Sequence, residues 1–353
     1  MKPYEEAQQR IRRHPRRWLV TGAAGFIGSH LVESLLGLDQ DVTGLDNFST
    51  GKRENLELVA AAVGPRRWRR FRFLEGDIRS LEDCRAACAG AHTVLHEAAL
   101  GSVPRSIVDP LASHHSNVTG FLNMLVASRD AGVERFVYAS SSAVYGDHPA
   151  LPKAEPQIGR AVSPYGATKH MNEIYAGVFA SCYGFHSIGL RYFNVFGPRQ
   201  DPDGAYASVI PAWIGALLRG QIAYVNGDGR AARDFCHVDN VVQANLLAAT
   251  VEDPRALDQA YNVALGEQTT LSELFEMIRA ALAVRLPRVR AVAPVHREPR
   301  PGDMRLSRAD IGKAARLLGL QPGVRIRNGL ERTIQWYAER LLPAQQERKA
   351  AHV

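Results

Sequence analysis

A glycine-rich turn between a short apolar run and an amphipathic stretch restricts the fold of this chain most strongly. Arg17–Thr21 is typical of a buried strand, and the stretch from Phe26 to about Leu36 is typical of a helix. The junction carries Gly22, Gly25 and Gly28, whose spacing allows a tight turn and a close approach of the backbone to a pyrophosphate. The N-terminus of a helix also offers free N–H groups to phosphates. The segment therefore predicts a dinucleotide site that opens a doubly wound α/β sheet.

The apolar runs that follow predict further parallel strands of the same sheet. Helical stretches such as Asn117–Ala131 alternate with the runs Asp41–Leu45, Phe71–Ile78, Thr93–Ala99 and Phe136–Ala139. Ligands of such sheets bind at the carboxyl ends of the strands. The residues expected at these ends are Gly22, Asp46, Asp77, Ala98 and Ser141.

Asp46 indicates which dinucleotide is bound. It lies about 20 residues beyond the glycines, where a carboxylate suits the ribose hydroxyls. A carboxylate would repel a 2′-phosphate, which favours NAD over NADP, although the nearby Lys52 and Arg53 weaken this preference. The alternative is a generic glycine turn in which Asp46 only caps a helix.

The segment Ser163–Lys169 predicts proton transfer to and from an alcohol or a ketone. On a helix, Tyr165 and Lys169 are i and i+4, so both side chains leave the same face. A nearby ammonium favours phenolate over phenol, so we expect Lys169 to lower the tyrosine pKa from its usual value of about 10. A serine hydroxyl from the neighbouring strand end, such as Ser141, can bond the same substrate oxygen. A dinucleotide close by would receive the hydride.

Composition argues against several other classes of protein. No run of about 18 apolar residues occurs, so we expect no membrane span. Residues 1–16 lack the apolar core of a signal peptide, and the four cysteines lack metal-ligand spacing. We therefore expect a cytoplasmic protein with free thiols and no metal. The net charge is +7, and residues 66–70 hold four arginines. We interpret this cluster as a solvated face and expect no nucleic acid, because it lies between a helix and a strand of the nucleotide fold.

Six motifs together resemble those of the extended short-chain dehydrogenase/reductase family and, within it, the nucleotide-sugar 4-epimerases. They are T-G-A-A-G-F-I-G-S-H from Thr21, L-D-N-F-S-T-G from Leu45, S-S-S-A-V-Y-G from Ser140, S-P-Y-G-A-T-K from Ser163, R-Y-F-N-V-F-G-P-R-Q from Arg191 and R-D-F-C-H-V-D-N from Arg233. Three more segments resemble the bacterial subgroup that acts on UDP-N-acetylglucosamine and UDP-N-acetylgalactosamine for O-antigen, lipopolysaccharide and capsule synthesis. They are G-S-V-P-R-S from Gly101, Y-G-D-H-P-A-L-P from Tyr145 and F-G-P-R-Q-D-P-D-G-A-Y from Phe196.

The resemblance implies a Rossmann fold with a retained NAD and a role for each matching residue. Tyr165 becomes the base and acid, Lys169 its modulator, and Ser141 the catalytic hydroxyl, with Ser142 as the adjacent alternative. The residues expected at NAD are Gly22, Gly25, Phe26, Ile27, Gly28, Asp46, Asn47, Ser49, Thr50, Gly51, Asp77, Ile78, Ala98, Ala99, Tyr165 and Lys169. The residues expected at the UDP-sugar are Ser102, Ser106, Ser142, Asn194, Ala207, Val209, Tyr224, Asn226, Arg233, Arg300, Asp303 and Ser307.

Within this set, the resemblance implies particular contacts with the nucleotide. Arg233 and Arg300 match a diphosphate clamp, Asp303 a contact to the uridine ribose, and Tyr224 a residue that stacks on uracil. The chemistry implied is removal of the O4 proton by Tyr165 with hydride transfer from C4 to NAD. The 4-keto sugar then rotates, the hydride returns to the opposite face of C4, and the proton returns to O4, which completes the cycle.

Ser307 is the position that bears most on substrate choice. In related epimerases restricted to non-acetylated sugars, the matching position holds a bulky tyrosine. A serine leaves space for a 2-acetamido group, because a filled pocket rejects a group by steric overlap. Ala207 and Val209 are small and favour the same interpretation. The alternative is a helix cap, since Ser307 precedes a segment that looks like a helix start.

We expect a cofactor domain over residues 17–190, to which residues 237–263 return, and a substrate domain over residues 191–353. The resemblance implies a homodimer joined by helices near residues 117–131 and 164–182.

Two other epimerase activities remain alternatives. One is a UDP-2-acetamido-uronic acid 4-epimerase, which would use Arg105 or Arg199 for the extra carboxylate, and the other is a UDP-glucose 4-epimerase. A 4,6-dehydratase normally has an acid pair after the catalytic hydroxyl, where Ser142 and Ala143 stand here. A catalytically dead NAD-binding protein would have lost the Tyr165–Lys169 pair.

Overall fold

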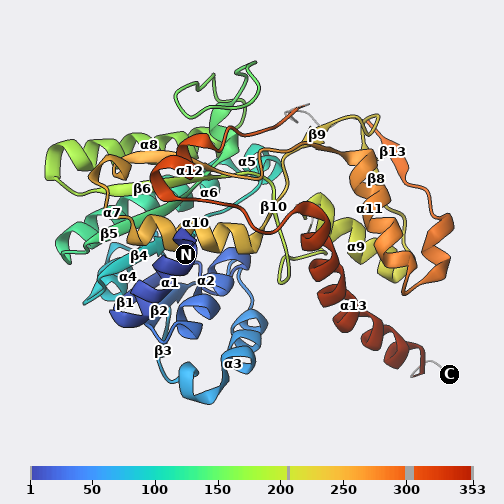
Figure 1. Ribbon diagram of the computed structural model, residues 1–353, viewed down its shortest axis with the longest axis horizontal. Helices are drawn as coiled ribbons and strands as arrows, with labels where there is room; N and C mark the ends of the chain where they lie inside the picture. Colours follow the sequence, from blue (N-terminus) through green and yellow to red (C-terminus); the bar gives the residue numbers. More distant parts are fainter. Residues whose placement is uncertain (1, 205–206, 299–305, 351–353) are drawn as a thin grey trace.

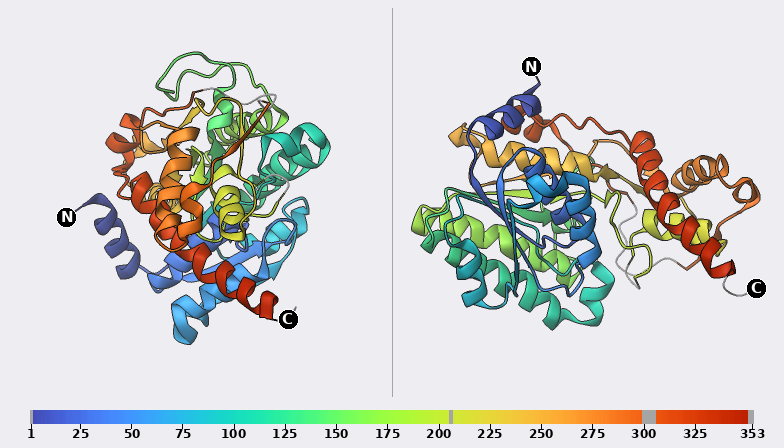
Figure 2. Two further views of the ribbon diagram at one scale, coloured as in Figure 1. Left: turned by 90° about the vertical axis from the view of Figure 1, so that its right-hand side faces the viewer. Right: turned by 90° about the horizontal axis from the view of Figure 1, so that it is seen from below.

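The chain forms a large lobe around a parallel sheet and a smaller lobe beside it (Figure 1). The computed structural model describes residues 2–204, 207–298 and 306–350. The large lobe holds the N-terminal half, and the smaller lobe holds most of the segment after residue 191, as the two views of Figure 2 show. No helix among the described residues is long and apolar enough to span a membrane.

Seven parallel strands make up the main sheet, in the order β11-β6-β5-β4-β1-β2-β3. Their bounds are β1 Arg17–Thr21, β2 Asp41–Asp46, β3 Phe71–Glu75, β4 Thr93–His96, β5 Arg135–Ser141, β6 Ser187–Tyr192 and β11 Gln259–Val263. The order reverses direction between β1 and β4, which is where ligands of such sheets bind. The predicted doubly wound Rossmann sheet is confirmed.

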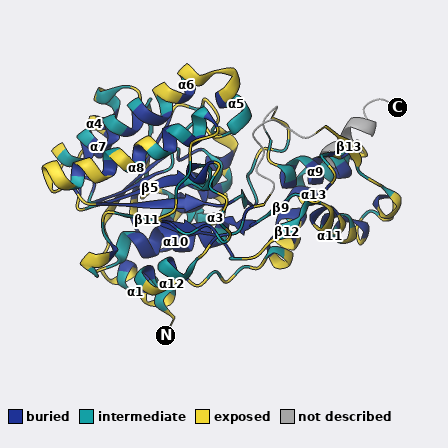
Figure 3. Ribbon diagram, turned by 90° about the horizontal axis from the view of Figure 1, so that it is seen from above, coloured by how far each residue is buried: buried dark blue, intermediate teal, exposed yellow. Residues whose placement is uncertain are grey.

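Helices cover both faces of the sheet, and the central strands are buried between them (Figure 3). One face carries α1 Pro3–Arg13, α2 Phe26–Gly37, α3 Arg53–Trp68, α10 Val238–Thr250 and α12 Gly312–Leu318. The other carries α4 Leu81–Cys88, the π-helical turn His115–Thr119, α7 Gly120–Asp130 and α8 Pro164–Tyr183. Each face has its own apolar core, as expected for strands buried on both sides.

The first helix, α1, is part of this packing. Ala7 and Ile11 are buried against the core that α2 and α10 share, and Gln40 donates a hydrogen bond to the Ile11 carbonyl at 3.0 Å. Residues 3–13 therefore form a helix that packs on the large lobe.

The smaller lobe has its own core of aromatic and aliphatic side chains, around Trp213, Phe275 and Tyr337. Its helices are α9 Val209–Arg219, α11 Leu271–Ala283 and α13 Ile326–Ala350. Its short strands pair as β8 Tyr224–Asn226 with β13 Val295–Arg297, and β9 Ala232–Arg233 with β12 Thr269–Thr270. Between the lobes, β7 Val195–Phe196 pairs with β10 Cys236–His237.

Short helices complete the connections. They are α5 Val103–Val108, α6 Pro110–His114, and the 3-10 turns Ser142–Tyr145, Pro254–Ala256 and Pro287–Ala291. Two expectations differ from the structure. The strand expected over residues 71–78 ends at Glu75, so Asp77 and Ile78 lie on the following loop. Residues 308–311 are not helical, and the next helix, α12, begins only at Gly312 with Ile311 at its N-cap, so the helix-cap interpretation of Ser307 is wrong.

Candidate active site

The start of α8 holds Tyr165 and Lys169 on the side that faces the sheet. Ser163 caps the helix by accepting a hydrogen bond from the Gly166 N–H at 3.1 Å, and Pro164 occupies the first turn. The backbone N–H of Tyr165 donates to the hydroxyl of Ser106 at 3.0 Å. Ser106 is fully buried. Its hydroxyl therefore braces the helix start that carries Tyr165.

Lys169 reaches the end of the central strand β5. Its Nζ donates a hydrogen bond to the carbonyl oxygen of Ala139 at 2.8 Å, and its side chain is 3% exposed. Burial lowers the pKa of Lys169 to about 8, against the opposing charges of Glu97 and Glu173. An ammonium held here lies close to the strand end that supplies Ser141.

The pKa of Tyr165 is raised by the protein's own groups, whereas the sequence argument expected Lys169 to lower it. Burial is the largest cause and the Glu97 carboxylate adds to it, while a hydrogen bond with the hydroxyl of Ser141 acts in the opposite direction. Desolvation opposes the phenolate because a charged group loses its water shell on burial. The i, i+4 spacing predicted that the two side chains share a face but could not predict how dry the site is.

Ser141, rather than either serine beside it, carries the hydroxyl that meets Tyr165. Its Oγ also accepts a hydrogen bond from the Ala143 N–H at 3.1 Å and caps the turn Ser142–Tyr145. Ser140 donates to Glu173 at 2.6 Å instead. Along an extended strand, successive side chains point to opposite faces, which accounts for the difference between these two neighbours.

The glycine turn after β1 forms the wall of the first cavity. Gly22 has a φ of +67°, a left-handed conformation that glycine adopts without strain. A Cβ added to Gly28 would lie 2.1 Å from the carbonyl oxygen of Gly22, so the helix packs on the turn only because residue 28 has no side chain. The third glycine of the motif thus has the packing role that its spacing predicted.

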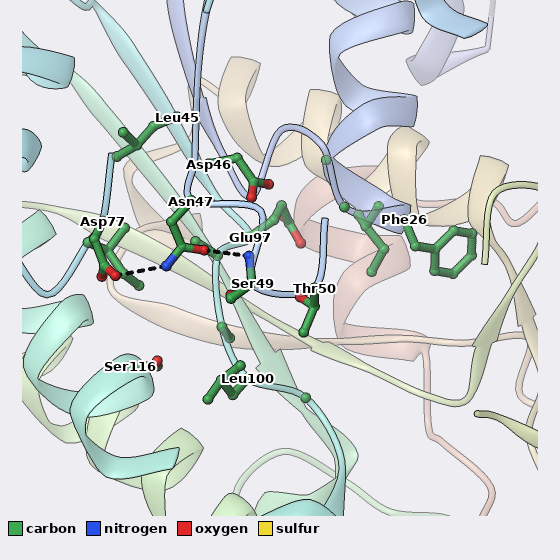
Figure 4. A pocket seen from close by; sticks show the side chains of 18 of the residues that line it. Phe26, Leu45, Asp46, Asn47, Ser49, Thr50, Asp77, Glu97, Leu100 and Ser116 are labelled. Carbon is green, nitrogen blue, oxygen red and sulfur yellow. Dashed lines mark hydrogen bonds between the residues drawn. The ribbon is translucent and has the colours of Figure 1, made fainter. Parts of the chain in front are cut away.

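This cavity has a volume of about 270 Å³ and lies at the carboxyl ends of β1, β2 and β4 (Figure 4). Of the residues expected at NAD, those that line it are Gly22, Gly25, Phe26, Ile27, Gly28, Asp46, Asn47, Ser49, Thr50, Asp77, Ile78, Ala98 and Ala99. Gly51 lines the neighbouring cavity, and Tyr165 and Lys169 lie beyond the lining of both.

Two acidic residues of this cavity are held by hydrogen bonds. Asp46 accepts from the Ala24 N–H at 2.9 Å and the Phe48 N–H at 2.8 Å, and burial raises its pKa. Asp77 accepts from Asn47 at 2.8 Å, and Arg79 holds its pKa at about 2 (Figure 4). Both carboxylates are therefore fixed in place at the rim where an adenosine would lie.

The two cations that weakened the choice of NAD over NADP have acidic partners. Lys52 forms an ion pair with Asp201 at 3.0 Å, and Arg53 pairs with Glu75 at 2.7 Å. A 2′-phosphate would meet the Asp46 carboxylate and two cations that are already neutralised. The arrangement therefore favours NAD.

A second, larger cavity of about 830 Å³ lies between the two lobes. Of the residues expected at a UDP-sugar, those that line it are Ser102, Asn194, Ala207, Val209, Tyr224, Asn226 and Arg233. Ser49, Thr50 and Gly101 line both cavities, so the two spaces adjoin. A ligand in the second cavity would therefore lie next to a dinucleotide in the first.

Several predicted substrate residues already have partners within the protein. Asn194 donates to the Asp234 carbonyl at 2.9 Å, and the guanidinium of Arg297 lies 3.1 Å from the ring centroid of Tyr224. Ser142 lies beside the catalytic hydroxyl but does not line the cavity, nor does the buried Ser106. Arg300 and Asp303 fall outside the described residues.

Ser307, also expected at the UDP-sugar, does not line this cavity and is 1% exposed. Its backbone N–H donates to the Ala232 carbonyl at 3.0 Å, next to Arg233. Its hydroxyl is buried and has no hydrogen-bond partner among the residues that the structure describes.

Sequence reasoning missed three polar groups that position the site. The Asn117 side chain donates to Thr168 on α8 at 3.2 Å and bonds both backbone groups of Leu100, so it ties the cavity loop to the catalytic helix. Arg191 forms a two-pronged ion pair with Glu173. Glu97 places a carboxyl in the cofactor cavity. Their partners are distant in sequence, so only Arg191, as part of a recognised motif, carried a signal.

The comparisons with known proteins agree with this geometry. The model of the NAD dependent epimerase/dehydratase family matches residues 18–264, more than half of the chain. The chain belongs to this family. A member from Mycolicibacterium smegmatis, a UDP-glucose 4-epimerase, is 37% identical over 324 residues, which cover 91% of this chain and 98% of the relative.

Solved structures of other epimerases have the same fold over nearly their whole length. A UDP-N-acetylglucosamine 4-epimerase from Methanobrevibacter ruminantium, in complex with UDP-N-acetylmuramic acid, has a TM-score of 0.83 at 34% identity and covers 92% of this chain and 99% of its own. The Thermus thermophilus UDP-glucose 4-epimerase in complex with NAD has a TM-score of 0.78 at 35% identity, covering 91% and 98%. As a family member, this chain is an NAD-dependent enzyme.

The family cofactor fits the first cavity. The cradle that a Cβ at Gly28 would fill, the free N–H groups at the start of α2 and the fixed Asp46 carboxylate suit a pyrophosphate and a ribose. Among the described residues no group of three or more His, Cys, Asp or Glu side chains is arranged to hold a metal ion.

Proposed function

We propose that this enzyme interconverts UDP-N-acetylglucosamine and UDP-N-acetylgalactosamine at C4 and keeps its NAD bound through the cycle. The support for a 4-epimerase is the pair of adjoining cavities and the hydrogen bond between Tyr165 and Ser141, which lies at the carboxyl end of β5. The relatives named above are 4-epimerases of UDP-sugars.

In this proposal Tyr165 handles the proton of the sugar hydroxyl. Its phenolate accepts the O4 proton, and its phenol returns a proton to O4 after the sugar has turned over. Bound NAD supplies the hydride acceptor and, once reduced, the hydride donor, so no net oxidation occurs. Ser141, whose hydroxyl is hydrogen-bonded to Tyr165, would hold the same sugar oxygen, and the Lys169 ammonium is fixed on the Ala139 carbonyl of the same strand.

The 2-acetamido specificity rests on Ser307. Ser307 is smaller than the tyrosine that the matching position holds in epimerases of non-acetylated sugars. Its buried hydroxyl, which has no partner among the described residues, would gain a hydrogen bond if the amide of an acetamido group approached. Because a filled pocket rejects by overlap, this single position separates acetamido sugars from plain hexoses.

The grip on UDP is proposed to come from the lining of the larger cavity. Arg233 suits a phosphate of the diphosphate, and Asn226 and Tyr224 suit the uridine. The Arg297 guanidinium on the Tyr224 ring would have to share that face with uracil or yield it. Arg300 and Asp303 stay as proposed ligands of the same nucleotide.

A UDP-glucose 4-epimerase is the second candidate, because a protein of that activity is 37% identical over nearly the full length. For the 2-acetamido-uronate alternative, the two arginines differ in position. Arg105 lines the larger cavity, whereas Arg199 is buried and paired with Glu33 on α2. Of these two arginines, Arg105 is the one proposed to meet a sugar carboxylate in that alternative.

The test of the proposed activity is a comparison of three substrates. The purified protein, without added NAD, is incubated with UDP-N-acetylglucosamine, UDP-glucose and UDP-N-acetylglucosaminuronic acid, and inversion at C4 is followed by proton NMR. We expect the first to react fastest. Faster reaction of UDP-glucose or of the uronic acid would replace the acetamido proposal with the corresponding alternative.

We also propose a homodimer through α7 and α8, with the product used for surface polysaccharide. Met171, Ile174 and Val178 lie on one face of α8 and are 41–55% exposed, which is costly for a face left in water. An Ile174→Glu variant should be a monomer by light scattering, whereas Tyr183→Glu, further along the helix and off this face, should remain a dimer.

We keep the division into residues 17–190 with 237–263, and 191–353, as the proposed domain boundary.

A further inference from the structure

Glu97 is a carboxyl group in the cofactor cavity that the mechanism above does not use. It follows β4, at the carboxyl end of a central strand, and lines the cavity beside Ala98 (Figure 4). Its Oε1 accepts a hydrogen bond from the hydroxyl of Tyr192 at 2.8 Å. Its Oε2 is buried and has no hydrogen-bond partner among the described residues. A buried carboxyl with an unpartnered oxygen is expensive and calls for an explanation.

The titratable groups that face Glu97 come from three elements. Strands β4 and β5 pair with His96 opposite Tyr138, so Glu97 follows beside Ala139, whose carbonyl holds the Lys169 ammonium. The charge of Glu97 acts on both Lys169 and Tyr165 of α8. Tyr192 approaches from β6. Asn245 of α10 donates a hydrogen bond to its hydroxyl at 2.8 Å, and Cys236 acts on it electrostatically. His96, the last residue of β4, precedes Glu97 in the chain and is hydrogen-bonded to the hydroxyl of Thr21.

This environment places the titration of the Glu97 carboxyl in the pH range in which enzymes work. Burial raises the pKa of Glu97 to about 7, and the hydrogen bond from Tyr192 and the charge of Lys169 oppose that rise. Near neutrality, the carboxyl is therefore divided between its neutral and ionised forms. A leucine or glutamine would fill the same volume without this property.

We propose that Glu97 is a positioning residue of the catalytic centre, which keeps the Lys169 ammonium charged and thereby sets the upper pH limit at which Tyr165 can exchange its proton. The proposal rests on the proposed role of Tyr165 as the base. It needs no covalent or redox step at Glu97, because the carboxyl acts through its charge alone.

The direction of the effect follows from the sign of that charge. An ionised carboxylate stabilises the protonated form of each neighbour, so it raises the pKa of Lys169 and of Tyr165. Removing the charge lowers both values together. The whole profile of kcat/KM against pH should therefore move toward lower pH. The loss of activity should be largest on its alkaline limb, where Lys169 loses its proton.

The experiment compares Glu97→Gln with Glu97→Asp in the holoenzyme. Glu97→Gln keeps the shape and an acceptor for Tyr192 but has no charge, and we expect the alkaline limb to move down by about one pH unit. Glu97→Asp restores a charge and should restore the limb. The ratio of wild-type to Glu97→Gln activity should grow with pH above neutrality. An equal loss at every pH would show a structural role only and would overturn the proposal.

A second readout does not depend on turnover. The tyrosinate absorbance of the protein, minus that of its Tyr165→Phe variant, follows the ionisation of Tyr165 itself. In the Glu97→Gln background the midpoint of this difference should lie at lower pH than in wild type, and an unchanged midpoint would contradict the proposal. If no UDP-sugar reacts at all, the proposed function fails, while this titration still decides the electrostatic role of Glu97.

Discussion

Lys169 Nζ and the carbonyl oxygen of Ala139 are joined by a 2.8 Å hydrogen bond that links the catalytic helix to the central strand of the sheet. The bond joins α8 to β5, so it holds the ammonium near the strand end that carries the Ser141 hydroxyl. The carboxyl end of the central strand β5 therefore fixes where the charged group of the site lies.

Removing the phenol of Tyr165 should abolish proton transfer without disturbing the fold. We expect Tyr165→Phe to lower kcat by about 10²–10⁴-fold, with a smaller change in KM, since the loss is of acid–base catalysis. Steady-state rates with UDP-N-acetylglucosamine measure this, with Tyr175→Phe, ten residues along the same helix, as the control. Equal losses in the two variants would contradict a catalytic role for Tyr165.

A methyl group at Gly28 should destroy the cofactor site. In Gly28→Ala the added Cβ would meet the Gly22 carbonyl oxygen at 2.1 Å, which forces the phosphate-binding turn apart. We expect the purified variant to carry no NAD, measured by releasing and quantifying the nucleotide. Gly37→Ala, in the same helix with nothing within 4 Å of its Cβ, should retain NAD as wild type does. Retention of NAD by Gly28→Ala would refute the assignment of this turn.

Ser307 should decide between acetamido and plain sugars. Ser307→Tyr places a bulky ring at a position that is now 1% exposed, so we expect kcat/KM for UDP-N-acetylglucosamine to fall at least about 100-fold while UDP-glucose remains a substrate. Ser307→Ala keeps the space and should keep the acetamido activity. Parallel loss of both substrates in the tyrosine variant would point to misfolding or to a different specificity wall.

The pKa of Glu97 also makes a prediction about stability. The pKa of this carboxyl rises from 4.5 in the unfolded chain to about 7 in the folded protein. The group therefore contributes its full stability below pH 4.5 and loses it as the pH rises to 7. The free energy of unfolding of Glu97→Gln should therefore gain about 3 kcal/mol relative to wild type between pH 4.5 and 7.5. Urea denaturation at the two pH values measures this gap, and a gap that does not change with pH would mean an ordinary carboxyl.

The local motifs predicted the sheet and its strand-end residues well. Gly22, Gly28 and Asp46 lie within a single strand–turn–helix–strand unit, where spacing alone sets geometry. The Tyr165–Lys169 pair lies on one helix turn, and its shared face follows from the helical repeat.

The groups that sequence did not reveal depend on contacts between distant segments. Glu97 owes its raised pKa to burial, which outweighs the opposing hydrogen bond from Tyr192, and Tyr165 owes its raised pKa first to burial as well. Asn117 bridges Leu100 and Thr168 across 17 and 51 positions. No spacing rule connects such residues, because the sheet topology brings them together only after folding.

The most direct test uses UDP-N-acetylglucosamine deuterated at C4, incubated with the purified enzyme in ordinary water and no added NAD. If Tyr165 and a retained NAD invert C4 through a 4-keto intermediate, UDP-N-acetylgalactosamine will form with the deuterium still at C4, because the hydride leaves and returns on the same cofactor. Loss of the label to water, or no inversion even when NAD is supplied, would contradict this account.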